Sequence, residues 1–388
     1  HLDYEPADAN RIDPAIDSTN EGPLFGNQDY LDRAPRGIDA KFVWTNYPHT
    51  VGSPGLETGF VDLEQGWVWN HEDLPINATD LIFGNNRHGI STYLGNHGTA
   101  VIGEVSALDN DRGVIGIASG VGKVRVSSHY VIASDGTATS LNVAAAIIAA
   151  VPRMSPGDIL LLEVQRADAS GDWDKPVPTE SNISDFYAIQ FATALGIIVV
   201  EAAGNGSNNL DNMSHFGVTG TNTFNRTSSD FMDSGAIMVG ACSNTLKHVR
   251  MDFSNFGSRV DCCSWGDWSV TTTGYGDAGG GSGTTNSYTN GFAGTSSASP
   301  IIVGASLLIQ SYCKNYLGMT LTPKQMRDIL RKPANGTPIY TSSTGSTIEN
   351  LIGRQPNLKA IFNEKNKNFV RPDLYIRDNI DDNGNVPL

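Results

Sequence analysis

The chain is poor in cysteine and in positive charge, and it lacks a long apolar run. It has 4 cysteines in 388 residues, and 26 Lys and Arg residues against 41 Asp and Glu residues, for a formal net charge of −15. Phosphate binding requires clustered Lys and Arg side chains, so this balance argues against nucleic acid as a partner. No apolar run approaches the ~20 residues of a membrane-spanning helix, and we therefore expect no membrane association.

The few cysteines predict a sparse set of disulfide bonds at most. Cys262 and Cys263 are adjacent in a strand-like stretch, so their side chains should point to opposite faces. If the protein is secreted, one or both could bridge to Cys242 or Cys313. The alternative is that all of these thiols are buried and free.

The remaining composition is that of a globular protein. A hydrophobic fraction of 39% is enough for a sizeable core, and we expect a single domain over residues 1–388. Residues 1–39 are polar and rich in Asp, Asn and Pro, which predicts an N-terminal wrapping arm. A catalytic core would occupy residues 40–365, and a polar C-terminal tail residues 366–388.

Short apolar strands alternate with helical stretches from residue 58 onwards. The predicted strands are 60–62, 124–126, 159–164, 196–203 and 236–241, and the predicted helices are 97–106, 141–151, 183–195 and 322–330. Such alternation favours a parallel sheet covered by helices on both faces. We therefore predict an α/β fold, a three-layer α/β/α arrangement with a mostly parallel central sheet.

One serine stands in an unusual setting. Residues 294–300 read Gly-Thr-Ser-Ser-Ala-Ser-Pro, between a glycine-rich stretch (274–291) and an apolar run (301–309). Small residues around a serine expose its hydroxyl at the start of a helix. A serine hydroxyl is a weak nucleophile alone, so it needs a base and an orienting acid.

Candidates for both partners lie upstream of that serine. Asp62 ends a predicted strand, and His97 begins the segment His-Gly-Thr; His71 and His88 are the competing imidazoles. The order Asp, His, Ser is the one that subtilisin uses.

These segments together resemble the subtilase family of serine peptidases. In the family motif the serine directly after Gly-Thr reacts, which selects Ser296 over Ser297 and Ser299. The histidine directly before Gly-Thr is the base, which selects His97. The resemblance thus implies Ser296 as nucleophile, His97 as general base and then acid, and Asp62 as the group that orients the imidazole.

The resemblance also implies an oxyanion site and a substrate cleft. In Ala202-Ala203-Gly204-Asn205, the Asn205 amide would donate to the developing oxyanion, although Asn205 also opens a glycosylation sequon. The three residues before it would line the cleft, opposite a second wall formed by Glu163, Val164 and Gln165.

Two departures from the family pattern stand out. The usual Asp-Ser/Thr-Gly is replaced by Asp62-Leu63-Glu64, and Glu163 to Gln165 replace residues that are normally small. Since Glu163 lies in an otherwise apolar run, we expect its side chain to point away from the cleft. An inward Glu163 would instead favour Lys or Arg on the substrate.

The sequence therefore predicts a secreted, extracellular, monomeric serine endopeptidase that cleaves protein or peptide substrates through an acyl-enzyme. By the resemblance, His1 is a processed terminus, the chemistry needs no cofactor, and a structural calcium ion can be accommodated. A catalytically inactive binding protein of the same fold is one alternative. A hydrolase-fold esterase is another, but it requires Gly-x-Ser-x-Gly and places the serine before the histidine.

Overall fold

A six-stranded parallel sheet forms the centre of the computed structural model, which describes residues 28–48, 58–88, 96–110, 112–274, 285–340 and 352–369. The strand order is β10-β9-β8-β5-β1-β2, and every neighbouring pair is parallel. The strands are β1 (Gly59–Glu64), β2 (Lys123–Ser128), β5 (Ile159–Leu162), β8 (Ile198–Ala202), β9 (Ile237–Cys242) and β10 (Cys262–Trp265). The predicted parallel sheet is confirmed.

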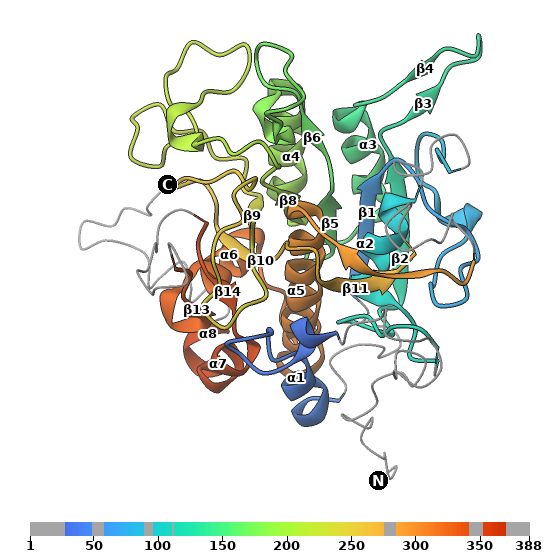
Figure 1. Cartoon of the computed structure of the whole chain (residues 1–388), viewed down its shortest axis with the longest axis vertical. Helices are drawn as coiled ribbons and strands as arrows, with labels where there is room; N and C mark the ends of the chain where they lie inside the picture. The colour runs from blue at the N-terminus through green and yellow to red at the C-terminus, as the bar shows by residue number, and fades with distance from the viewer. Residues whose placement is uncertain are drawn as a thin grey trace.

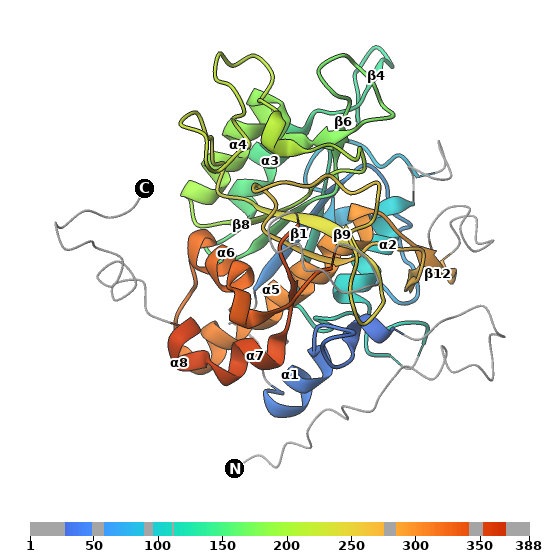
Figure 2. The ribbon, with the colours of Figure 1, turned by 60° about the vertical axis from the view of Figure 1, so that its left-hand side comes forward.

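Helices cover both faces of this sheet, as Figures 1 and 2 show. One face carries α2 (His97–Ser106), α5 (Thr295–Leu317) and α6 (Pro323–Arg331), and the other carries α3 (Val143–Ala150) and α4 (Ile183–Ala194). Side chains alternate between the faces along each strand, so Phe60 packs into the core beneath α5 and Val61 into the core beneath α3. The three-layer α/β/α prediction is correct.

Shorter elements surround these layers. An antiparallel hairpin of β11 (Val270–Thr273) and β12 (Tyr288–Phe292) packs on α2, and α1 (Ala40–Asn46) packs on α7 (Leu358–Asn363), which α8 (Lys365–Asn368) follows. Three two-stranded pairs are β3 (Val131–Ile132) with β4 (Ala138–Thr139), β6 (Gln165–Arg166) with β7 (Val177–Pro178), and β13 (Gly336–Thr337) with β14 (Gln355–Pro356). Single 3-10 turns lie at Asp29–Leu31, Ala78–Asp80, Val151–Arg153, Thr179–Ser181, Leu210–Asn212 and Pro333–Asn335.

The segment at residues 28–39 is tied to the core. Tyr30 and Leu31 are buried, and the Gln355 side chain donates to the carbonyls of Arg36 and Gly37 at 3.0 and 3.1 Å. The rest of the predicted arm (1–27), most of the predicted tail (370–388) and most of the glycine-rich stretch (275–284) lie outside the described residues. Within the described ranges, no helix is both long and apolar enough to cross a bilayer.

All four cysteines are buried, free thiols in this structure, so the expected disulfide bond is not supported. Cys262 packs into the core beneath α5, whereas Cys263 joins a separate cluster with Cys242. The two adjacent side chains thus point to opposite faces of β10, as the sequence predicts.

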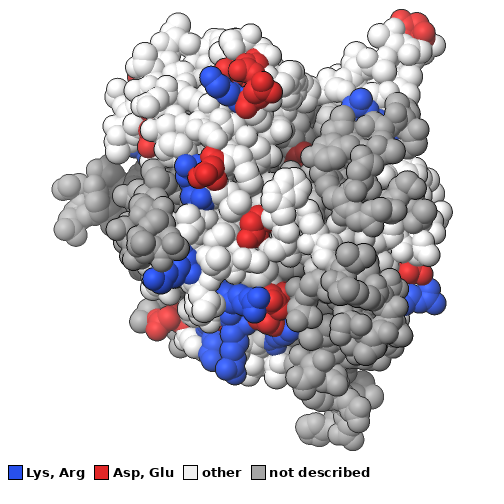
Figure 3. Space-filling model, in the orientation of Figure 1, with Lys and Arg blue, Asp and Glu red and all other residues white. Residues whose placement is uncertain are grey.

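Charged side chains are scattered over the face of the molecule drawn in Figure 3. Basic groups gather mainly near its lower edge, where acidic groups lie beside them, and large areas carry no charge. The described residues of this face therefore form no continuous basic surface of the kind that a nucleic acid would require.

Candidate active site

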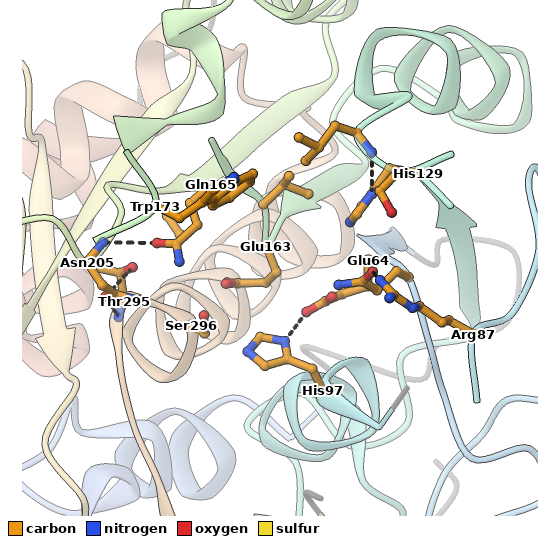
Figure 4. Close-up of a pocket in the computed structure, with 15 residues that line it drawn as sticks. Glu64, Arg87, His97, His129, Glu163, Gln165, Trp173, Asn205, Thr295 and Ser296 are labelled. Atoms are coloured by element: carbon orange, nitrogen blue, oxygen red, sulfur yellow. Dashed lines mark hydrogen bonds and ion pairs between the residues drawn. The ribbon is translucent and has the colours of Figure 1, made fainter. Parts of the chain in front are cut away.

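A cavity of about 420 Å³ opens where β1, β5 and β8 end. Ligand sites of open α/β sheets lie beyond the carboxyl ends of the strands, and this cavity follows that rule. Figure 4 shows its wall, which comprises Glu64, Gln65, Arg87, His97, His129, Ser140, Leu141, Glu163, Val164, Gln165, Trp173, Ala202, Asn205, Thr295 and Ser296.

His97 and Glu64 form the central contact of the site. Glu64 is the last residue of β1 and His97 the first residue of α2, and Glu64 Oε1 contacts His97 Nδ1. Both side chains are largely buried, and the edge of the imidazole meets the ring of Phe292 at 5.3 Å between centroids. The contact fixes the ring so that its other nitrogen faces Ser296 (Figure 4).

Asp62 does not occupy the position that the sequence analysis gave it. Its Oδ2 accepts a hydrogen bond from Trp67 Nε1 at 2.7 Å, and the residue is fully buried and outside the cavity wall. Burial raises the pKa of Asp62 well above its usual range, and the neighbouring Glu64 raises it further. The geometry therefore corrects the assignment: the carboxylate that contacts His97 is Glu64.

Two features of the sequence point to Glu64. β1 runs to Glu64, two residues beyond the predicted end of the strand, and residues two apart in a strand share a face. Glu64-Gln65-Gly66 also matches the acid-x-Gly spacing of the family motif, with Glu in place of Asp. The Trp67 indole that binds Asp62 packs directly against Gly98 of α2. A Cβ added at Gly98 would lie 2.3 Å from the indole nitrogen, so this close contact requires a glycine.

Ser296 reaches the cavity through a tight turn. Gly294 precedes α5 with φ of +95°, a conformation that favours glycine, and Ser296 is the second residue of the helix. The competing hydroxyls are engaged elsewhere: Ser297 Oγ donates to Trp265 O at 3.0 Å and Ser299 Oγ to Thr295 O at 2.5 Å. His71, a competing imidazole, is buried against Ser287 O at 2.9 Å.

Asn205 lies just beyond β8 with its side chain held in one orientation. Its Oδ1 accepts from Thr295 N at 2.9 Å and from Thr295 Oγ1 at 3.0 Å, so its NH₂ group is the part available to a ligand. The Ser296 N–H belongs to the first turn of α5, where amides have no intrahelical acceptor. Figure 4 shows Asn205 and Thr295 on the same side of the Ser296 side chain.

The predicted substrate-binding residues divide into two groups. Glu163, Val164, Gln165 and Ala202 line the cavity, whereas Ala203 and Gly204 do not. Glu163 is 7% exposed and its side chain points into the cavity (Figure 4), so the expectation that it points away was wrong. The expectation rested on the apolar run around Glu163, but alternation along the chain continues past β5: Leu162 and Val164 pack beneath α3, and Glu163 shares the α5 side with Leu161.

Sequence analysis missed several residues of the wall: Gln65, Arg87, His129, Ser140, Leu141, Trp173 and Thr295. His129 is buried and accepts from Leu141 N at 3.1 Å. Burial, together with the charges of Arg166 and Arg87, lowers the pKa of His129 to about 3, so this imidazole is neutral near pH 7. Trp173, half exposed, comes from a loop with no motif to mark it.

No group of three or more His, Cys, Asp or Glu side chains within the described ranges converges as a metal site. The cavity instead contains the parts of a serine hydrolase: a hydroxyl at a helix start, an imidazole held by a carboxylate, and two hydrogen-bond donors. The fold and the site thus define an α/β protein with a Ser-His-carboxylate constellation.

Comparison with known proteins is consistent with this class. The sequence profile of the subtilase family matches residues 57–356. Subtilisin DY of Bacillus licheniformis is 28% identical over 72% of this chain and 83% of its own length. Alkaline elastase YaB of a Bacillus strain is 26% identical over 80% of this chain and 68% of its own length. The chain belongs to the subtilase family and is a serine endopeptidase.

Solved structures share the fold at lower identity. A protease from Pseudoalteromonas arctica has a TM-score of 0.55 at 19% identity, over 87% of this chain and 97% of its own. The prenylagaramide maturation protease has a TM-score of 0.55 at 21% identity, over 84% and 97%. These likenesses concern the architecture alone.

Proposed function

We propose that the protein hydrolyses peptide bonds with a Glu64–His97–Ser296 triad, through an acyl-enzyme. The observation that carries the proposal is the contact of Glu64 with His97 Nδ1 in the cavity that also holds Ser296. A carboxylate at Nδ1 keeps the proton on that nitrogen and leaves the other one free to act as a base. It also stabilises the imidazolium that forms when the base takes a proton.

The reaction then has two halves. Ser296 Oγ attacks the peptide carbonyl carbon while His97 takes the hydroxyl proton. The oxyanion receives hydrogen bonds from the Asn205 NH₂ group and the Ser296 N–H. His97 passes its proton to the leaving amine, which departs and leaves an acyl ester on Ser296. A water molecule, deprotonated by His97, attacks this ester and releases the acid product and the free serine.

The same proposal covers the setting of the enzyme. The substrates are proteins or peptides, the enzyme acts as an extracellular monomer, and it has no nucleic acid or membrane partner. These statements rest on the family and on the acidic composition. One relative, 29% identical over 61% of this chain and 35% of its own length, is a calcium-dependent protease of Trichormus variabilis. The chemistry proposed here uses no metal, and any calcium would serve stability.

Covalent labelling tests the nucleophile. A biotinylated aryl phosphonate should label one serine in the wild type, and peptide mapping should place the adduct on Ser296. Labelling and turnover of a peptide amide should both vanish in Ser296→Ala and persist in Ser297→Ala, the adjacent control. No labelling of folded wild-type protein would favour the binding-protein alternative. Turnover of esters without amides would favour an esterase.

A further inference from the structure

Glu163 is a buried carboxyl group aimed into the cavity with no use in the mechanism above. The residue is 7% exposed, and both of its carboxylate oxygens are buried without a hydrogen-bond partner. Figure 4 shows this side chain extending from the end of β5 towards Ser296, on the side of Asn205. A partnerless polar group in such a place is costly unless it serves a ligand or a neighbouring reactive group.

The groups that face Glu163 are mostly acidic. Asp62 and Glu64 approach it from β1, Glu104 and His97 from α2, and the hydroxyls of Ser296 and Ser299 from α5. Burial raises the pKa of Glu163 well above its usual range, and the charges of Glu64 and Asp62 raise it further, against the opposing effect of the two hydroxyls.

The guanidinium groups of Arg87 and Arg166 bind side chains other than Glu163. Arg87 Nη1 binds Gln65 Oε1 at 2.7 Å, and Arg166 Nε binds Asp185 Oδ2 at 2.6 Å. The Ser299 hydroxyl donates its only proton to Thr295 O, so towards Glu163 it can only accept. A contact with that hydroxyl therefore requires the proton to be on Glu163.

We propose that Glu163 works as a neutral carboxylic acid, a positioning residue that donates a hydrogen bond to the Ser296 hydroxyl, and that its ionisation inactivates the enzyme at alkaline pH. This inference rests on the proposed function of Ser296. As a donor, the acid leaves the Ser296 proton directed at His97. As a carboxylate it would accept that proton instead and divert it from the base. Its charge would also oppose the developing oxyanion.

The test is the pH dependence of kcat for a peptide amide in wild type, Glu163→Gln and Glu163→Ala, normalised by phosphonate titration of active sites. Wild type should lose activity as Glu163 ionises at alkaline pH. Glu163→Gln keeps a donor and cannot ionise, so its alkaline decline should disappear. Glu163→Ala should also lack the decline, but its kcat at neutral pH should fall by roughly two- to tenfold, the worth of one hydrogen bond, with KM little changed.

Glu104→Gln is the matched control, because Glu104 is a fully buried carboxyl without a partner that lies outside the cavity wall. It should keep the alkaline decline. If Glu163→Gln does not fold, Glu163→Leu removes the same ionisation and must also abolish the decline. An unchanged alkaline decline in a folded Glu163 variant overturns the inference, and so does a neutral-pH kcat in Glu163→Ala equal to that of wild type. Failure of the wild type to react with the phosphonate would instead count against the proposed function.

Discussion

Two clusters of buried ionisable groups, the site carboxylates and the Arg259 network, differ in how their charges are balanced. The site carboxylates are Asp62, Glu64, Glu104 and Glu163. The Arg259 network consists of Arg259, Glu180 and Asp261, with Glu201 at its edge. In the network, the Arg259 guanidinium binds Glu180 at 2.7 and 2.9 Å and Asp261 at 2.9 Å, and all three residues are almost completely buried.

The balance of charge determines the protonation state in each cluster. Burial alone would raise the pKa of Glu180, but the Arg259 charge reverses this and lowers it, so Glu180 is held ionised as a structural partner. At the edge of the network, burial and the Glu180 charge raise the pKa of Glu201, which Arg259 approaches only to 3.7 Å. Among the site carboxylates, burial raises the pKa values of Glu104 and Glu163, and no guanidinium compensates. The same chemical groups at the same depth thus hold the fold together in one region. In the other, Glu64 and Glu163 line the cavity that also holds Ser296.

The largest expected effect distinguishes the roles of Glu64 and Asp62, two carboxylates that lie two residues apart in β1. Glu64→Ala should lower kcat/KM by about 10⁴-fold, the loss seen when the triad carboxylate of another serine protease becomes an amide. Asp62→Asn keeps an oxygen for the Trp67 indole and should cost less than about tenfold, the worth of one neutral hydrogen bond. Peptide-amide kinetics on titrated sites would measure both. The reverse ranking would restore Asp62 as the orienting acid.

Removing the guanidinium from the Arg259 network should affect stability rather than catalysis. Arg259→Met leaves Glu180 buried without its guanidinium partner, whereas Asp261 keeps Arg226 at 2.7 Å; the unpaired Glu180 should lower the free energy of unfolding by about 3–5 kcal/mol. Urea denaturation near pH 7 would measure it, and kcat per titrated site should be unchanged in the folded fraction. The double variant with Glu180→Gln should recover part of the loss. A loss below about 1 kcal/mol would mean that the network is no better than a surface ion pair.

Asn205→Ala tests the proposed role of the Asn205 amide as a hydrogen-bond donor to the oxyanion. The Asn205 amide meets an oxyanion that exists only in the transition state, so kcat should fall by about 10²–10³-fold with little change in KM. That magnitude is the one known for the equivalent asparagine of subtilisin and is carried over from it. Thr295→Val, which removes one of the two hydrogen bonds that orient Asn205, should show a smaller loss of the same kind. A rise in KM at constant kcat would instead mark Asn205 as a substrate-binding group.

Sequence reasoning reached the sheet and three site residues because their signals are local. Small residues around Ser296, the start of α2 at His97 and the strand-to-polar change at Asn205 all lie within short segments. The carboxylate that contacts His97 was missed because strand ends are set by pairing with neighbours: β1 continues to Glu64, where it pairs with Ser128 of β2. Likewise, His129 and Trp173 reach the cavity through loops whose course depends on tertiary packing.

The last prediction compares two buried histidines, one in each region. His129 lies in the cavity wall; His215 lies by the Arg259 network, with its ring stacked on Phe224 at 4.1 Å. Burial lowers the pKa of His215 to about 4, and Glu180 and Arg259 act on it in opposite directions. The folded state therefore holds this imidazole neutral, while the unfolded chain binds a proton at its ordinary value of about 6.5. The stability that His215 contributes is therefore complete above about pH 6.5, and it is lost as the pH falls towards about 4.

A difference measurement is needed because the buried carboxyls act in the opposite sense. Their raised pKa values mean that the folded state binds more protons than the unfolded state between these limits. Relative to His215→Gln, wild type should lose about 1.4 kcal/mol of unfolding free energy per pH unit below about 6.5, the linkage slope for one proton. His129→Gln should show the same slope and continue to lower pH, because the pKa of His129 is lowered further, to about 3. A flat difference for His215 would mean that its ring is reached by solvent, and that the balanced region is less closed than its hydrogen bonds indicate.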